Sequence, residues 1–124
     1  MRILCVDDDK DIRDLLPELL GLSDLEAIAV QDAQAALRLM ETEQFSLYII
    51  DGQMPGVSGL GLCEEIRKRD METPVIVFSA HGYDADREAG MRAGANVYLV
   101  KPDTSQIVPT VWRLLEQAHA ANSF

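Results

Sequence analysis

Five short apolar runs alternate with longer helical patterns, and this alternation restricts the fold more than any other feature of the sequence. Each run is of strand length and rich in β-branched side chains, as buried strands are. The predicted strands are residues 3–6, 27–30, 47–50, 75–78 and 97–100, and the predicted helices are residues 12–20, 33–42, 60–69, 84–93 and 105–120. The pattern is that of repeated βαβ units.

Runs that are apolar over their full length suit parallel strands covered on both faces. Right-handed crossovers between such strands leave few topologies. We therefore expect an α/β fold of three layers, with a doubly wound, five-stranded parallel sheet between two layers of helices.

Length and charge limit the classes of protein to consider. The 124 residues fit one domain, residues 1–124, without a linker or a repeat. The formal net charge of -10 opposes binding to nucleic acid and to anionic membranes. Neither a signal peptide nor a membrane-spanning apolar stretch is visible, which indicates a cytoplasmic protein. Cys5 and Cys63 form no metal-binding pair, and we expect both to be reduced and buried.

Proline and glycine mark several helix boundaries. Pro17 and Pro109 fall within helical patterns, where each removes a backbone hydrogen bond, so kinks or late helix starts are expected there. Gly21 and Gly94 follow the ends of helical patterns, where a C-terminal glycine is common.

Polar side chains stand at the carboxyl ends of four predicted strands, the edge where open parallel sheets bind ligands. They are Asp7, Asp8, Asp9, Asp51, Ser79 and Lys101. Clustered carboxylates suit Mg²⁺, while an amine and a hydroxyl can hold phosphoryl oxygens. A carboxylate nucleophile beside a metal and an ammonium group is sufficient for phosphoryl transfer.

Each of these residues also has a simpler interpretation. Asp7 and Asp8 could be a helix cap and a first-turn acid, as we assume for Asp9, and Asp51 could be a turn residue before Gly52. Taken alone, the hydroxyl and the amine would be surface groups. Their convergence at one edge favours a site.

Over essentially its whole length the sequence resembles the response-regulator receiver family of two-component signalling, a CheY-like superfamily. The resemblance is carried by VDD at 6–8, DGQMPG at 51–56 with Gly59, SA at 79–80, AGA at 93–95 and YLVKP at 98–102. It implies a flavodoxin-like sandwich with strand order 2-1-3-4-5. It also implies a signalling switch with self-phosphorylation and slow self-dephosphorylation, not a turnover enzyme.

The resemblance implies a role for each acid. Asp51 would be the phosphoacceptor, forming 4-aspartylphosphate. Asp7, Asp8 and Asp51 would hold Mg²⁺ or Mn²⁺, with the backbone carbonyl of Gln53 as a further ligand. The donor would be a phosphohistidine on a sensor histidine kinase or on a histidine phosphotransfer protein of a phosphorelay.

The resemblance also assigns the phosphoryl-binding and switch residues. Lys101 would pair with the phosphoryl group and be followed by a cis peptide bond to Pro102. Ser79 would turn its hydroxyl toward the phosphoryl oxygens, and Tyr98 would swing inward, changing the surface of helix 84–93, strand 97–100 and the last helix. Tyr98 could instead be an ordinary half-buried strand aromatic.

Two residues and one helix carry further hypotheses. Gln53 and His81 lie two residues beyond Asp51 and Ser79 and could modulate attack by water, although an exposed loop histidine fits equally well. The last helix is apolar over a wide arc: Trp112 would lie with Val108 and Leu115, while Ile107, Val111 and Leu114 serve the core. This arc suits a homodimer or output-domain contact, although a helix packed against a neighbouring element would look the same in the sequence. His119 is expected at the surface.

Three other functions compete with this one. A receiver-like module could signal without phosphate. A phosphohydrolase of the haloacid dehalogenase type would need an acid in place of Gln53. A flavin mononucleotide site would need hydroxyls after the first strand, where acids stand. Departures from the family at Asp103, Pro17 and Pro109 leave the output surface and dimer geometry open.

Overall fold

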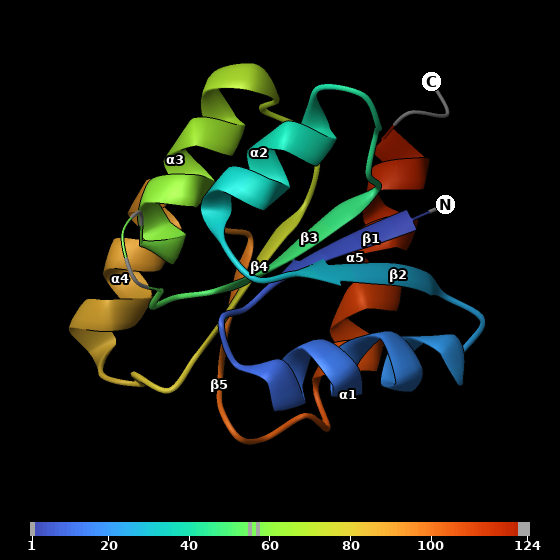
Figure 1. The fold of residues 1–124 in the computed structure, drawn as a ribbon, viewed down its shortest axis with the longest axis horizontal. Coiled ribbons are helices and arrows are strands. Elements are labelled where there is room, and N and C mark those ends of the chain that lie inside the picture. The colour runs from blue at the N-terminus through green and yellow to red at the C-terminus, as the bar shows by residue number, and fades with distance from the viewer. Residues whose placement is uncertain (1, 55, 57, 122–124) are drawn as a thin grey trace.

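The computed structural model describes residues 2–54, 56 and 58–121 as an alternation of strands and helices (Figure 1). The strands are β1 (Arg2–Val6), β2 (Glu26–Val30), β3 (Leu47–Asp51), β4 (Val75–Ser79) and β5 (Val97–Val100). The helices are α1 (Lys10–Gly21), α2 (Ala33–Met40), α3 (Gly59–Arg69), α4 (Asp84–Ala93) and α5 (Ile107–Ala121). All strand pairs are parallel, in the order β2-β1-β3-β4-β5, which confirms the predicted α/β flavodoxin-like topology.

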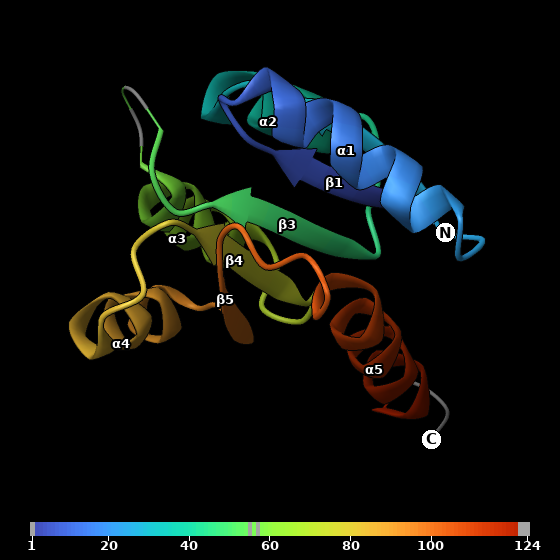
Figure 2. The ribbon, with the colours of Figure 1, turned by 90° about the horizontal axis from the view of Figure 1, so that it is seen from below.

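Helices cover both faces of the sheet. In Figure 1, α2, α3 and α4 lie on one side of the strands, and α1 and α5 lie on the other. Successive residues of one strand face the two layers. Leu4 packs with α2 and α3 residues, and Ile3 and Cys5 pack with α1 and α5 residues. Figure 2 shows β5 lying between α4 and α5. The two cores explain why the strands are apolar between their end residues.

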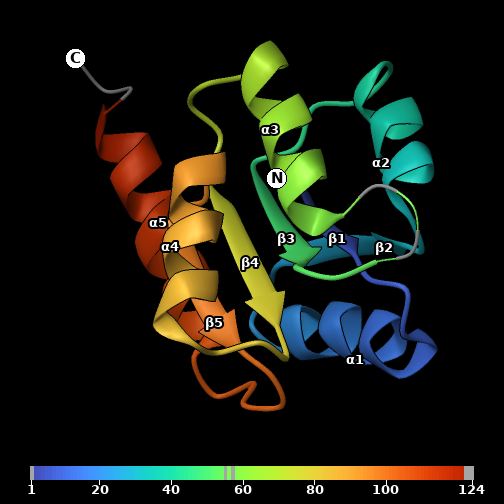
Figure 3. The same ribbon diagram turned by 90° about the vertical axis from the view of Figure 1, so that its left-hand side faces the viewer.

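The carboxyl ends of the strands meet at one edge. Figure 3 shows the arrowheads of β3 and β4 pointing the same way, as parallel pairing requires. Both strands run one residue further than predicted, so Asp51 and Ser79 are themselves the last strand residues. The backbone of each is fixed by pairing with its neighbour strand.

Helix starts follow the capping residues. α1 begins at Lys10, two residues earlier than predicted, because the Asp9 carboxylate caps it by accepting a hydrogen bond from the Asp11 backbone N–H (2.9 Å). α5 begins at Ile107, so Pro109 lies in the first turn, where no N–H partner is needed. This is the late start that the proline predicted. α1 continues through Pro17.

The two predicted glycine caps have different outcomes. Gly94 ends α4 in the left-handed region, with φ of 115°, as predicted. Gly21 is only the last helical residue of α1, and the prediction of a glycine cap there is wrong. The left-handed residue is Asp24, with φ of 61°, in a turn that the Leu25 N–H to Leu20 carbonyl hydrogen bond (3.0 Å) closes.

Two further observations concern the chain as a whole. Cys5 and Cys63 are free and buried, as predicted. Across the residues that the structure describes, no helix has the length and apolar character needed to cross a membrane.

Candidate functional site

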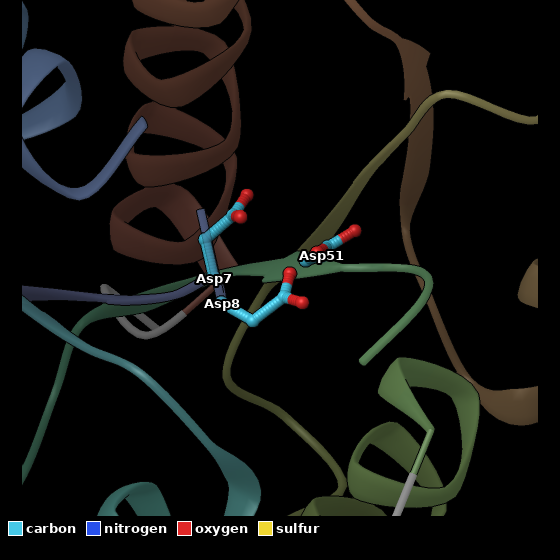
Figure 4. Close-up of side chains that lie close together, drawn as sticks. All are labelled: Asp7, Asp8 and Asp51. Carbon is cyan, nitrogen blue, oxygen red and sulfur yellow. The ribbon is translucent and has the colours of Figure 1, made fainter. Parts of the chain in front are cut away.

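Three carboxylates meet at the carboxyl ends of β1 and β3, which are neighbours in the sheet. One oxygen each from Asp7, Asp8 and Asp51 lies within 4.8 Å of the other two, and Figure 4 shows the three side chains gathered at this edge. Asp7 and Asp51 are only 2% and 5% exposed, whereas Asp8 faces solvent. The predicted acidic cluster is therefore present, and Asp9 is left to cap α1.

Lys101 follows β5 and reaches the cluster past the end of β4. Its Nζ lies 2.8 Å from Asp7 Oδ2 and 3.4 Å from Asp51 Oδ1. It also lies 5.7 Å from the centre of the Phe78 ring. Burial lowers the pKa of Lys101, but the hydrogen bonds and charges of Asp7 and Asp51 outweigh burial and raise it. The Lys101–Pro102 peptide is cis, as the resemblance implied.

One ammonium group does not balance three carboxylates. Burial is the main reason that the pKa of Asp51 is raised to about 7, and a hydrogen bond with Asp8 and the charge of Asp7 act in the same direction. The Gln53 N–H, 3.1 Å from Asp51 Oδ1, and Lys101 act against this rise. Oxygen-only donors with surplus negative charge fit a hard divalent cation such as Mg²⁺ or Mn²⁺.

The backbone around the cluster is held by hydrogen bonds that the sequence did not reveal. Arg13 of α1 donates from Nη1 to the carbonyl of Asp7 (3.1 Å) and to that of Asp8 (2.9 Å). The Asp9 N–H donates to Asp7 Oδ1 at 2.9 Å. In the sequence, Arg13 looks like any helix arginine, and no pattern separates it from a solvent-facing one.

Two glycines allow other elements to approach Asp51 closely. A Cβ at Gly59, the first residue of α3, would lie 1.8 Å from the Asp51 carbonyl oxygen. A Cβ at Gly52 would lie 2.8 Å from Ser79 Oγ. The start of α3 therefore packs directly against the Asp51 backbone, and the end of β4 packs directly against Gly52, the residue after Asp51. Gly52 is more than the turn residue that an Asp-Gly pair suggests.

The predicted switch residues surround a small cavity beside the cluster. Ser79 is 1% exposed, and its Oγ accepts from the His81 N–H (3.2 Å). Tyr98 is 8% exposed and lies inward, with its hydroxyl donating to the His81 carbonyl at 2.6 Å. The cavity, of about 60 Å³, is lined by these three residues and by Gln53 and Leu60, among others. Gln53 and His81 thus both border it, although the His81 side chain is exposed.

The last helix has a narrower exposed apolar arc than the sequence indicated. Ile107, Val111 and Leu114 are buried as predicted, but Leu115 is also in the core, only 7% exposed. The placement of Leu115 beside Trp112 on the outer face is therefore wrong. Trp112 itself is 37% exposed. His119 is exposed, and Asp103 is exposed and accepts from the Ser105 N–H.

Comparison with known proteins gives consistent results. A model of the family described as "Response regulator receiver domain" matches residues 3–111. The chain is 33% identical to "Probable transcriptional regulator ycf27" of Galdieria sulphuraria, with 99% of this chain and 49% of the relative covered. It is 34% identical to "Transcriptional regulatory protein CpxR" of Klebsiella pneumoniae, with 95% and 50% covered. The chain thus spans about half the length of the curated relatives it matches.

Solved structures show the same similarity. The receiver domain of the Francisella response regulator 1452 has a TM-score of 0.88 at 28% identity, covering 94% of this chain and 97% of that one. NtrX from Brucella abortus has a TM-score of 0.90 at 32% identity, covering 97% of this chain and 28% of that one. The family match includes every strand-end residue assembled at the site. The chain therefore belongs to the response-regulator receiver domain family, the signalling switches of two-component systems.

Proposed function

We propose that residues 1–124 form a single receiver domain that accepts a phosphoryl group on Asp51. The observation that carries this proposal is the position of the buried Asp51 carboxylate, beside two further acids and 3.4 Å from the Lys101 ammonium. An Asp51 carboxylate oxygen would attack the phosphorus of a phosphohistidine. The P–N bond would break, and the imidazole nitrogen would keep its electron pair.

The acids would hold a divalent cation. Asp7, Asp8 and Asp51, with the backbone carbonyl of Gln53, are the proposed ligands of Mg²⁺ or Mn²⁺. When bound, the cation would supply neutralisation of the carboxylates and of the phosphoryl oxygens. Lys101 would provide the second positive charge. Arg13 would keep the β1–α1 turn in place through the carbonyls of Asp7 and Asp8.

Ser79 and Tyr98 would respond to the phosphoryl group. The Ser79 hydroxyl would donate to a phosphoryl oxygen, and the inward position of Tyr98 would be favoured, which changes the surface formed by α4, β5 and α5. Gln53 and His81 border the cavity between these residues. Their side chains are proposed to modulate hydrolysis, and unchanged phosphoryl lifetimes in Gln53→Ala and His81→Ala variants would argue against that role.

The proposed partners follow from this chemistry. The phosphoryl donor would be a sensor histidine kinase or a histidine phosphotransfer protein, acting in the cytoplasm. The α4, β5 and α5 surface would contact a second copy of the chain or an output domain. Relatives named as transcriptional regulators are about twice as long as this chain, which supports an output domain as the contact. With a net charge of -10, the receiver domain itself is not expected to contact nucleic acid.

Intact mass after incubation with acetyl phosphate tests the proposal. The wild type should gain one phosphoryl group in the presence of Mg²⁺ and none in the presence of a chelator. Asp51→Asn should gain none under either condition. Asp14→Asn, which changes an exposed acid outside the cluster, should behave as the wild type. A folded wild type without an adduct would favour a receiver-like module that signals without phosphate.

A further inference from the structure

The inward ring of Tyr98 occupies space that a side chain on α4 would fill. A Cβ built on Gly90 would lie 2.7 Å from Tyr98 Cδ2 and 3.1 Å from Cε2. Its next neighbour, Leu60 Cδ2, would be at an ordinary distance of 3.8 Å. Gly90 is one of the two buried residues of α4, the other being Ala93. The inward ring therefore depends on the absence of a side chain at position 90.

The backbone around Gly90 is tied down, so it cannot easily move to accept a larger residue. The Gly90 carbonyl accepts from the Ala95 N–H (3.1 Å) in the turn that ends α4. The carbonyl of Gly94 in the same turn accepts from Arg67 Nε of α3 (2.9 Å). On the other side, Tyr98 is paired with Val77 within the sheet. The Tyr98 side chain, with two rotatable bonds, is the part that would have to move.

Two other contacts hold the ring in its inward position. The guanidinium carbon of Arg87, three residues before Gly90 on α4, lies 5.7 Å from the ring centre. Arg87 Nη1 also donates to the Tyr98 carbonyl at 3.3 Å. The Tyr98 hydroxyl donates to the His81 carbonyl, two residues past Ser79. One helix thus supplies both the space for the ring and a cation over its face.

We propose that Gly90 is a positioning residue of the switch, which acts through Tyr98 by leaving room for the inward ring against α4. Arg87 closes over the ring and adds to the stability of the inward state. A side chain at position 90 shifts the population toward an outward Tyr98. The placement of the ring is independent of phosphoryl chemistry, and only its effect on phosphorylation rests on the proposed function.

The first test measures the position of the ring directly. In the wild type, nuclear Overhauser effects should connect the Tyr98 ring protons with the Gly90 Hα protons. Gly90→Ala should lose the contacts between residue 90 and the ring, and the ring resonances should shift toward solvent-exposed values. Gly21→Ala is the matched control, because a Cβ at this helical glycine meets nothing within 4 Å. A folded Gly90→Ala variant whose ring keeps its inward contacts overturns the inference.

The second test connects ring position with phosphorylation. Gly90→Ala should lower the rate of adduct formation with acetyl phosphate and Mg²⁺ by about fivefold or more, a common size for coupling between two sites. In a Tyr98→Ala background the same substitution should have no further effect, because the ring that it displaces is gone. An equal loss in both backgrounds would overturn action through Tyr98. A wild type without any adduct would count against the proposed function, while the ring contacts would still decide the role of Gly90.

Discussion

At the scale of single residues, the ionised form of Asp51 carries an electrostatic cost in the folded protein. Its carboxylate is buried beside two other acids, and burial, followed in effect by its acidic neighbours, raises its pKa from 3.8 to about 7. Lys101 offsets only part of this cost, since its Nζ is nearer to Asp7 than to Asp51. The burial of this carboxylate therefore lowers the stability of the folded protein, and perturbed acids of this kind are common at functional sites.

Removal of the Asp51 charge should therefore stabilise the protein when divalent cations are absent. Below pH 3.8 the residue is protonated in both the folded and the unfolded chain. Between this pH and about 7, the unfolded chain ionises first, so the free energy of unfolding falls as the pH rises. We expect Asp51→Asn to be more stable than the wild type by about 1 to 3 kcal/mol at pH 8, with little difference at pH 4. Urea denaturation with a chelator at both pH values measures this.

The control for this prediction is an acid without the same burial. Asp14 of α1 is exposed and pairs with Lys10, so Asp14→Asn should change stability by less than about 0.5 kcal/mol at either pH. If Asp51→Asn proves less stable than the wild type at pH 8, then Asp51 makes net favourable contacts and the argument from burial fails.

At the scale of helices and strands, Arg67 links α3 to the turn that follows it, to the end of α4 and to the start of β5. Its guanidinium donates to the carbonyls of Thr73 (2.7 Å), Asp70 (3.1 Å) and Gly94 (2.9 Å), and to the Asn96 side chain (2.9 Å). The α3–β4 turn, the end of α4 and the start of β5 are thus held by one side chain. The single ammonium group of a lysine cannot reproduce this planar set of guanidinium N–H donors.

We expect Arg67→Lys to lower the free energy of unfolding by about 1 to 3 kcal/mol, because several partly buried acceptors lose their donor at constant charge. Chemical denaturation of the two proteins gives the difference. Arg69→Lys, at an exposed position of the same helix, should be nearly neutral. Equal stability of Arg67→Lys and wild type would show that water replaces the lost donors.

The order of elements follows from the sequence, and many contacts between them do not. Strands were predictable to within one residue, because burial on both faces makes each run apolar throughout. The acidic cluster was predictable because parallel strands end at one edge. In contrast, Leu115 faces the core and Gly21 does not cap its helix. Both outcomes depend on how α5 and the α1–β2 turn pack against the sheet.

The residues that support the site, and those that join one element to another, were also out of reach of the sequence. Arg13 and Arg67 bond to backbone carbonyls, which have no signature in side-chain patterns. Gly52 and Gly90 matter because of the side chains that approach them, Ser79 and Tyr98 respectively. Such close approaches become visible only when the packing of one element on another is known. The periodicity of apolar residues shows which face of a helix or strand is buried. It does not show which other element packs against that face.

At the scale of the whole molecule, binding of a divalent cation should increase the measured stability of the folded protein. The formal net charge is -10, and the acidic cluster concentrates negative charge at one edge of the sheet. A ligand that binds only the folded state stabilises it by mass action, about 2.7 kcal/mol at a concentration 100 times its Kd. We expect Mg²⁺ to raise the thermal midpoint of the wild type at constant ionic strength, as measured by thermal denaturation.

Two single-charge variants separate site binding from general screening of charge. Asp8→Asn removes an exposed member of the cluster, so it should fold normally and lose most of the Mg²⁺ effect. Asp11→Asn makes the same change in net charge on an exposed first-turn acid and should keep the effect. An equal response in all three proteins would indicate general screening.

Lys101 links the acidic edge of the sheet to the stretch of chain that leads into α5. The ammonium is drawn to Asp7 on β1 and to Asp51 on β3, while the lysine backbone directly follows β5. Only the short segment 102–106 separates Lys101 from the first turn of α5. The ion pairs of this one lysine therefore involve three strands of the sheet, because they hold the chain that leaves β5 to the ends of β1 and β3.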